Sequence, residues 1–185
     1  MKTQCSLDAA NAVKAGATPP AGVSVNTEDC ATPVLTVDGV FDDAWECVKP
    51  AIGKYTYAYF TFIEDESSPS DGFLYILNDW MFNTLAEVDP DCFNLFTVFT
   101  GNFAQEWTIR VFGDQTTEVI LNGETVQERA LVGSGEISAV GAAGFGPSPN
   151  SEFNHTIFEL KFPALKGTFK GRVGGDGGCR KARRA

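Results

Sequence analysis

Short runs of alternating apolar and polar residues recur along the chain between turn-forming residues. Such a period of two is typical of strands that bury one face. In residues 106–112, for example, the alternation places Trp107, Ile109 and Val111 on one side, so we expect them to point into a core. No convincing amphipathic helix separates the runs, which predicts an all-β fold, an antiparallel sandwich or barrel. The expected strands cover residues 34–37, 54–63, 73–77, 92–100, 106–112, 119–121, 124–126, 136–140 and 156–162.

The turns and loops divide the chain into three parts. Asn122-Gly123 predicts a type I′ hairpin, because both residues accept a positive φ. Two segments are expected to be loops: the oxygen-rich residues 64–72 and the glycine- and proline-rich residues 141–151. We expect an irregular N-terminal leader over 1–33, a sandwich domain over 34–165, and a flexible, basic, glycine-rich tail over 166–185.

Charge is unevenly distributed over the 185 residues, whose formal net charge is −10. Residues 166–185 contain seven basic residues and one acidic residue, which leaves seven basic and 23 acidic residues, a net charge of −16, in residues 1–165. A domain this acidic repels a phosphate backbone, so the sequence argues against a nucleic-acid partner.

Five widely spaced cysteines indicate one or two disulfides in an oxidising compartment. The odd number leaves a cysteine over, and Cys179 in the tail is the expected one. We therefore expect a secreted, extracellular protein. No apolar stretch approaches the length of a membrane span. Residues 1–18 do not resemble a signal peptide, so the expected form is a mature or trimmed chain.

The sequence offers little for catalysis. His155 is the single histidine, and no Gly-x-Ser-x-Gly elbow or phosphate-binding glycine loop is present. Carboxylate pairs are abundant, but in a chain this acidic they carry little weight. The sequence thus favours a binding protein over an enzyme.

Three motifs occur in an order that resembles family 9 carbohydrate-binding modules and their DOMON-like relatives. They are Val37-Asp38-Gly39-Val40-Phe41-Asp42-Asp43-Ala44-Trp45, Asp71-Gly72-Phe73-Leu74-Tyr75-Ile76-Leu77-Asn78-Asp79, and Thr156-Ile157-Phe158-Glu159-Leu160-Lys161-Phe162-Pro163. Trp45 is expected to pack back as a core anchor, and Pro163 to end its strand. The resemblance spans about residues 34–165 and implies an antiparallel β-sandwich of the jelly-roll, DOMON-like type that binds a polysaccharide or glycan. A partner enzyme or a surface assembly is the other partner we expect.

A sugar site needs an aromatic face together with carboxylates or amides for the hydroxyl groups. Asn78, Asp79 and Trp80 supply this mixture where a strand is expected to end, so they are the candidate ligand-binding residues. The alternative is that Trp80 is packed under a loop. No second stacking aromatic residue is identifiable from the sequence.

Two other ligands and one other role stay open. The resemblance implies a structural calcium ion, for which Asp65 and Asp71 are candidate ligands, although a solvated acidic loop is the competing interpretation. Some DOMON-like domains bind haem b, and Met81 and His155 are the alternative haem ligands here. A structural or adhesive surface module is the third hypothesis.

Overall fold

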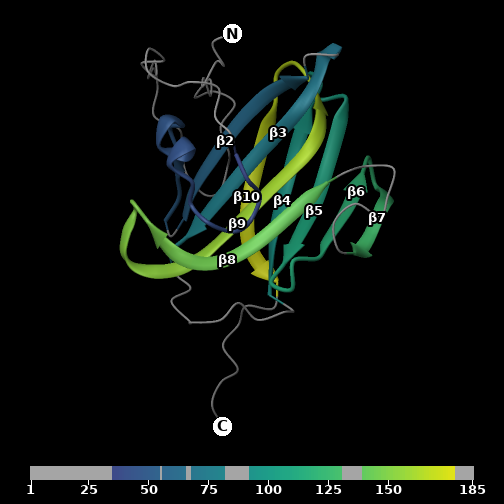
Figure 1. The fold of residues 1–185 in the computed structure, drawn as a ribbon. Coiled ribbons are helices and arrows are strands. Elements are labelled where there is room, and N and C mark those ends of the chain that lie inside the picture. The colour runs from purple at the N-terminus through teal and green to yellow at the C-terminus, as the bar shows by residue number, and fades with distance from the viewer. Residues whose placement is uncertain (1–34, 55, 66–67, 82–91, 131–138, 178–185) are drawn as a thin grey trace.

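The computed structural model describes residues 35–54, 56–65, 68–81, 92–130 and 139–177. Two five-stranded antiparallel sheets pack face to face, as Figure 1 shows, which confirms the predicted β-sandwich. The first sheet has the order β1-β2-β3-β9-β8, with β1 Ala51–Ile52, β2 Thr56–Asp65, β3 Ser68–Trp80, β9 Ser151–Leu165 and β8 Val140–Ser148. The second has the order β10-β4-β5-β6-β7, with β10 Lys170–Gly177, β4 Phe93–Thr100, β5 Gln105–Phe112, β6 Thr117–Leu121 and β7 Glu124–Ala130.

The main core lies between the two sheets. Trp107, Ile109 and Val111 are buried there, as their alternation predicts. Trp107 contacts Phe162 of the opposite sheet, with ring centroids 5.0 Å apart. Burial of such rings is the largest contribution to the stability of the sandwich.

A second, smaller core covers the outer face of the first sheet. Residues 35–48, including the 3₁₀-helix η1 (Asp43–Cys47), cross that face, and Trp45 is 1% exposed against it. Trp45 contacts Tyr59 of β2 at a ring-centroid distance of 6.0 Å. The expected role of Trp45 as a core anchor is therefore confirmed, in a layer outside the sandwich interior.

Two local predictions have opposite outcomes. Asn122 and Gly123 have φ values of 51° and 85° between β6 and β7, which confirms the type I′ hairpin. The expected strand over 34–37 is wrong, because residues 35–37 form no ladder. Leu35 and Val37 instead pack against the outer core, which explains their apolar character without a strand.

The glycine- and proline-rich segment is a strand for most of its length, so the loop predicted over 141–151 is wrong. Residues 140–148 form β8 and pair with β9. A Cβ atom on Gly144 would lie 2.1 Å from the carbonyl oxygen of Gly39, where residues 35–48 cross the strand. The small residues are there for close packing, which composition alone does not distinguish from a loop. Of the strand expected over 136–140, residues 136–138 lie outside the described residues.

The polar segment 64–72 is also mostly strand. β2 continues to Asp65, β3 begins at Ser68, and Asp65 is paired with Ser68. Polar residues form strands here because a hairpin end needs no apolar face.

Part of the predicted tail is ordered, so the expectation of a flexible end from residue 166 is wrong for residues 170–177. These form β10, which pairs with β4. Without β10, β4 would be the edge strand of the second sheet. Gly171 packs near Phe60, and Val173 is buried in the main core. Pro163 likewise does not end its strand, since β9 runs to Leu165. The pairing of β8 with β9 begins only at Lys161, so that side of β9 requires no donor from Pro163.

Cys47 and Cys92 are disulfide-bonded, while Cys5, Cys30 and Cys179 lie outside the described residues. Within the described part of the chain, no helix combines the length and apolar character needed to cross a membrane.

A candidate binding site at one end of the first sheet

Four side chains form a row across the inner face of the first sheet, at the end where β3 stops. Thr56 pairs with Trp80, Trp80 pairs with Thr156, and Thr156 pairs with Phe145. Directly opposed residues of an antiparallel pair point to the same face, so all four belong to the face that looks towards the second sheet. We call these four residues the end row. Trp80 and Phe145 are partly exposed, while Thr156 between them is fully buried.

Uncharged polar groups lie next to the end row. The side-chain amide of Asn78 donates to Oδ1 of Asn94 on the facing sheet at 3.0 Å, and the Thr56 hydroxyl contacts Oδ1 of Asn78. Nδ2 of Asn94 and Oγ1 of Thr156 are buried and have no hydrogen-bond partner in the described structure. Buried groups of this kind normally bind a partner or an ordered water. This end of the interior therefore retains unused hydrogen-bonding capacity.

Aromatic side chains frame this polar cluster. Trp80 contacts Phe158 with ring centroids 6.4 Å apart, and part of its indole stays exposed. Phe145 lies two strands from Trp80, which corresponds to about 10 Å between their backbones. The arrangement combines two aromatic surfaces with hydroxyl and amide groups.

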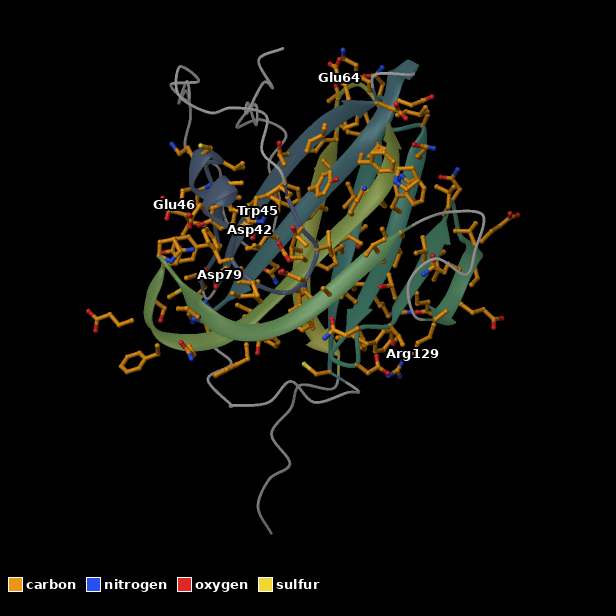
Figure 2. The ribbon with its side chains drawn as sticks, viewed as in Figure 1. Asp42, Trp45, Glu46, Glu64, Asp79 and Arg129 are labelled. Carbon is orange, nitrogen blue, oxygen red and sulfur yellow. The ribbon has the colours of Figure 1, made fainter. Side chains whose placement is uncertain are left out.

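A different network occupies the outer face of the same sheet end. Oδ2 of Asp79 accepts hydrogen bonds from the hydroxyl of Ser148 and the amide of Asn150, both at 2.6 Å. The same Asn150 amide also donates to the Tyr59 hydroxyl at 2.7 Å. In Figure 2, Asp79 lies between η1 and the curved β8–β9 hairpin. Asp79 thus joins the hairpin to the middle of the sheet.

His155 completes the Asp79 network, and both residues are 0% exposed. Nδ1 of His155 lies 2.7 Å from the carbonyl oxygen of Phe153, and Nε2 contacts Oδ1 of Asp79. A carbonyl can only accept, so Nδ1 carries a proton.

Glu159 anchors the outer layer. Its Oε2 accepts from the backbone N–H groups of Asp38 and Gly39 at 2.9 and 2.8 Å. Its Oε1 accepts from the Trp45 indole at 3.0 Å. Burial raises the pKa of Glu159 to about 7, although these hydrogen bonds act in the opposite direction. Glu159, which lies in the third motif, therefore binds two parts of the first motif, the Asp38-Gly39 backbone and the Trp45 indole.

Tyr59 is a neutral member of the outer network. Burial raises its pKa to about 12, while the hydrogen bond from Asn150 acts in the opposite direction. It can thus serve as a hydrogen-bonding phenol throughout the physiological pH range.

The three candidate sugar-binding residues do not share one surface. Asn78 and Trp80 point into the sandwich, while Asp79 points to the outer face, as strand alternation requires. Asn78 is 1% exposed and Asp79 is 0% exposed, so Trp80 alone of the three reaches solvent. The structure adds Phe145, Asn94 and Thr156 to the site. No signal in the sequence marked Phe145, because the register between β8 and β9 is what places it.

Asp65 and Asp71, the candidate calcium ligands, lie in β2 and β3 on either side of the hairpin turn. Among the residues that the structure describes, no group of three or more His, Cys, Asp or Glu side chains is arranged to hold a metal ion. These residues therefore provide no observed support for calcium.

The two candidate haem ligands come near one another. Met81 directly follows and His155 directly precedes the last β3–β9 pair, Trp80 with Thr156. His155, however, is enclosed, with one ring nitrogen directed at Phe153 and the other at Asp79. It would have to leave Asp79 to ligate an iron, so this arrangement does not fit a haem.

Comparisons of the chain with protein-family models, with curated proteins and with solved structures return no match.

Proposed function

We propose that this protein is a secreted, non-catalytic carbohydrate-binding module whose ligand binds at the end row. The observation that carries the proposal is the pair of partly exposed aromatic side chains, Trp80 and Phe145, on either side of a buried hydroxyl group that has no hydrogen-bond partner among the described residues. A pyranose ring offers an apolar face to such aromatic rings and hydroxyl groups to polar atoms nearby.

The polar groups of this site suit a neutral, hydroxyl-rich ligand. Thr156 can donate and accept, Asn94 has an amide donor left over, and the inward-facing polar side chains of this cluster are all uncharged. Because Thr156 and Asn94 are enclosed, a water molecule bound to them would relay their hydrogen-bonding capacity to a sugar hydroxyl. Charged ligands would find no counter-charge among these residues.

The secreted location is inferred from the cysteines. Cys47 and Cys92 are disulfide-bonded, which suits an oxidising compartment. The sequence resemblance to family 9 modules points to the same class of function.

The test is retention on insoluble cellulose, xylan and chitin, followed by affinity measurement on the polysaccharide that retains the wild type. Trp80→Ala and Phe145→Ala are each expected to weaken binding about tenfold or more, the effect of losing one stacked ring. Phe153→Ala is the matched control, because Phe153 is 70% exposed on the same hairpin but lies outside the end row. Equal binding by all three variants and the wild type would refute the proposed site.

The same samples separate the alternatives. A Soret band after addition of haem would favour the electron-transfer hypothesis. Concentration-dependent assembly that no polysaccharide affects would favour a structural or adhesive module.

A further inference from the structure

The end of the β8–β9 hairpin extends past the rest of the first sheet. The last β3–β9 pair is Trp80 with Thr156, whereas β8 and β9 continue to pair as far as Ser148 with Ser151. Residues 146–155, which we call the arm, therefore form a two-stranded ribbon with no third strand among the residues that the structure describes. An isolated ribbon of this kind is marginally stable in water, so its position must depend on other contacts.

Most of the side chains of the arm do not pack against the other described residues. Pro147, Pro149, Glu152, Phe153 and Asn154 are all exposed. By contrast, Ser148, Asn150 and His155 all contact one carboxyl group, that of Asp79. Asn150 reaches further, to Tyr59 on β2, so the arm folds back over the outer face of the sheet. Its described side-chain contacts to the sheet thus converge on Asp79 and the adjacent Tyr59.

The root of the arm belongs to the candidate binding site. Phe145 immediately precedes the arm on β8, and Thr156 immediately follows it on β9. Any change in the direction of the arm therefore shifts Phe145 relative to Trp80, which is fixed on β3 and packed against Phe158.

We propose that Asp79 is a positioning residue that acts through the sheet: by holding Ser148, Asn150 and His155 on the outer face, it fixes the arm and so keeps Phe145 opposite Trp80 on the inner face. Asp79 is enclosed, so it does not touch the ligand. The consequence for ligand binding rests on the proposed function: the arm would keep the two aromatic surfaces pre-organised. Pre-organisation raises affinity because the competent arrangement is already populated before the ligand arrives.

Ser148→Ala and Ser151→Ala form a matched pair for the test. Each serine hydroxyl accepts a local backbone hydrogen bond at 3.1 Å, Ser148 from Asn150 and Ser151 from Phe153. Only Ser148 also donates to Asp79. Both variants lose the local bond, so any difference between them reports the contact with Asp79. Asn150→Ala is a second variant, which removes the amide bonded to Asp79 and Tyr59.

The first measurement needs no ligand. Trp45 and Trp107 are 1% and 2% exposed, so quenching of tryptophan fluorescence by acrylamide reports mainly Trp80. We expect acrylamide to quench Trp80 fluorescence more strongly in Ser148→Ala and Asn150→Ala than in Ser151→Ala. In the same two variants, amide hydrogen exchange over residues 146–155 should be faster. If Ser148→Ala and Ser151→Ala are equally quenched, the inference is overturned.

The second measurement uses the polysaccharide that retains the wild type. Ser148→Ala is expected to weaken binding about fivefold relative to Ser151→Ala, mainly through a slower association rate, as expected when fewer molecules are in the competent state. Faster quenching with unchanged affinity would overturn the positioning role. If the wild type binds none of the polysaccharides, the proposed function fails, and the quenching comparison still decides whether Asp79 holds the arm.

Discussion

At the end of β3, the inner and outer faces of the first sheet differ in how fully their buried polar groups are hydrogen-bonded. On the outer face the Glu159 carboxyl group accepts three hydrogen bonds, and the Asp79 carboxyl group accepts two and contacts His155. On the inner face the uncharged Thr156 and Asn94 retain atoms with no hydrogen-bond partner among the described residues. An unpaired buried charge is far more costly than an unpaired neutral group, so the fold satisfies the charges first. Neutral groups can keep unused hydrogen-bonding capacity at a lower cost, and a water or a ligand can then use it.

Loss of the Glu159 carboxyl group should have the largest effect. Glu159→Ala leaves the N–H groups of Asp38 and Gly39 and the Trp45 indole without their acceptor. We expect the free energy of unfolding in a denaturant titration to fall by about 3–5 kcal/mol, the sum over several unpaired donors. Glu159→Gln keeps the size and one acceptor oxygen and should lose less. Equal losses in the two variants would show that the acceptors are unimportant.

Disturbing the close packing of the outer layer should have the second-largest effect on stability. Gly144→Ala places a Cβ atom 2.1 Å from the Gly39 carbonyl oxygen, whereas a Cβ atom on Gly146 meets nothing within 4 Å. We expect Gly144→Ala to lower the free energy of unfolding by about 2–3 kcal/mol. Gly146→Ala, two residues along the same strand, should be neutral or slightly stabilising. A similar result for both would mean that residues 35–48 do not cross β8 as described.

The pH dependence of stability should carry the signature of Glu159. Its folded-state pKa of about 7 exceeds the ordinary value of 4.5, so the folded protein binds the proton more tightly than the unfolded chain does. Stability should therefore rise as the pH falls from 7 towards 4.5, by at most about 1.4 kcal/mol per pH unit from this group. Glu159→Gln cannot titrate at this position and should lack this component. An identical pH profile in wild type and variant would contradict the assignment.

Removal of the Thr156 hydroxyl group from the inner face should cause the smallest change in stability. Thr156→Val keeps the shape of the side chain and removes the buried hydroxyl group, for which the described part of the chain offers no hydrogen-bond partner. We expect the free energy of unfolding to stay level or to rise by about 1 kcal/mol, while binding to the retained polysaccharide weakens. A loss of stability without any loss of binding would mean that the hydroxyl group serves the fold rather than the ligand.

Asn78, Asp79 and Trp80 show how much of the candidate site could be predicted from the sequence. The expectation that a polar and aromatic cluster ends a strand was correct, since β3 stops at Trp80. The expectation that the three side chains act together was wrong for a local reason. Consecutive strand residues alternate between faces, so the Asp79 side chain points to the opposite face from Asn78 and Trp80. Phe145 was missed because a run rich in glycine and proline is typical of loops. Tertiary contacts explain two of its glycines, since Gly144 packs against Gly39 and Gly141 packs against Val111.

The sequence by itself determined the strands with clear alternation, the inward side chains of β5 and the Asn122-Gly123 hairpin. Each of these depends on interactions between near neighbours or on one residue's backbone preference. Only the tertiary structure decided that residues 170–177 pair with β4, that residues 35–48 cover the first sheet, and that Trp80, Thr156 and Phe145 share a row. Those features depend on register between strands distant in the chain, which no local pattern encodes. The candidate site belongs to this second class, because its two aromatic residues meet only through the register of β9 with both of its neighbours.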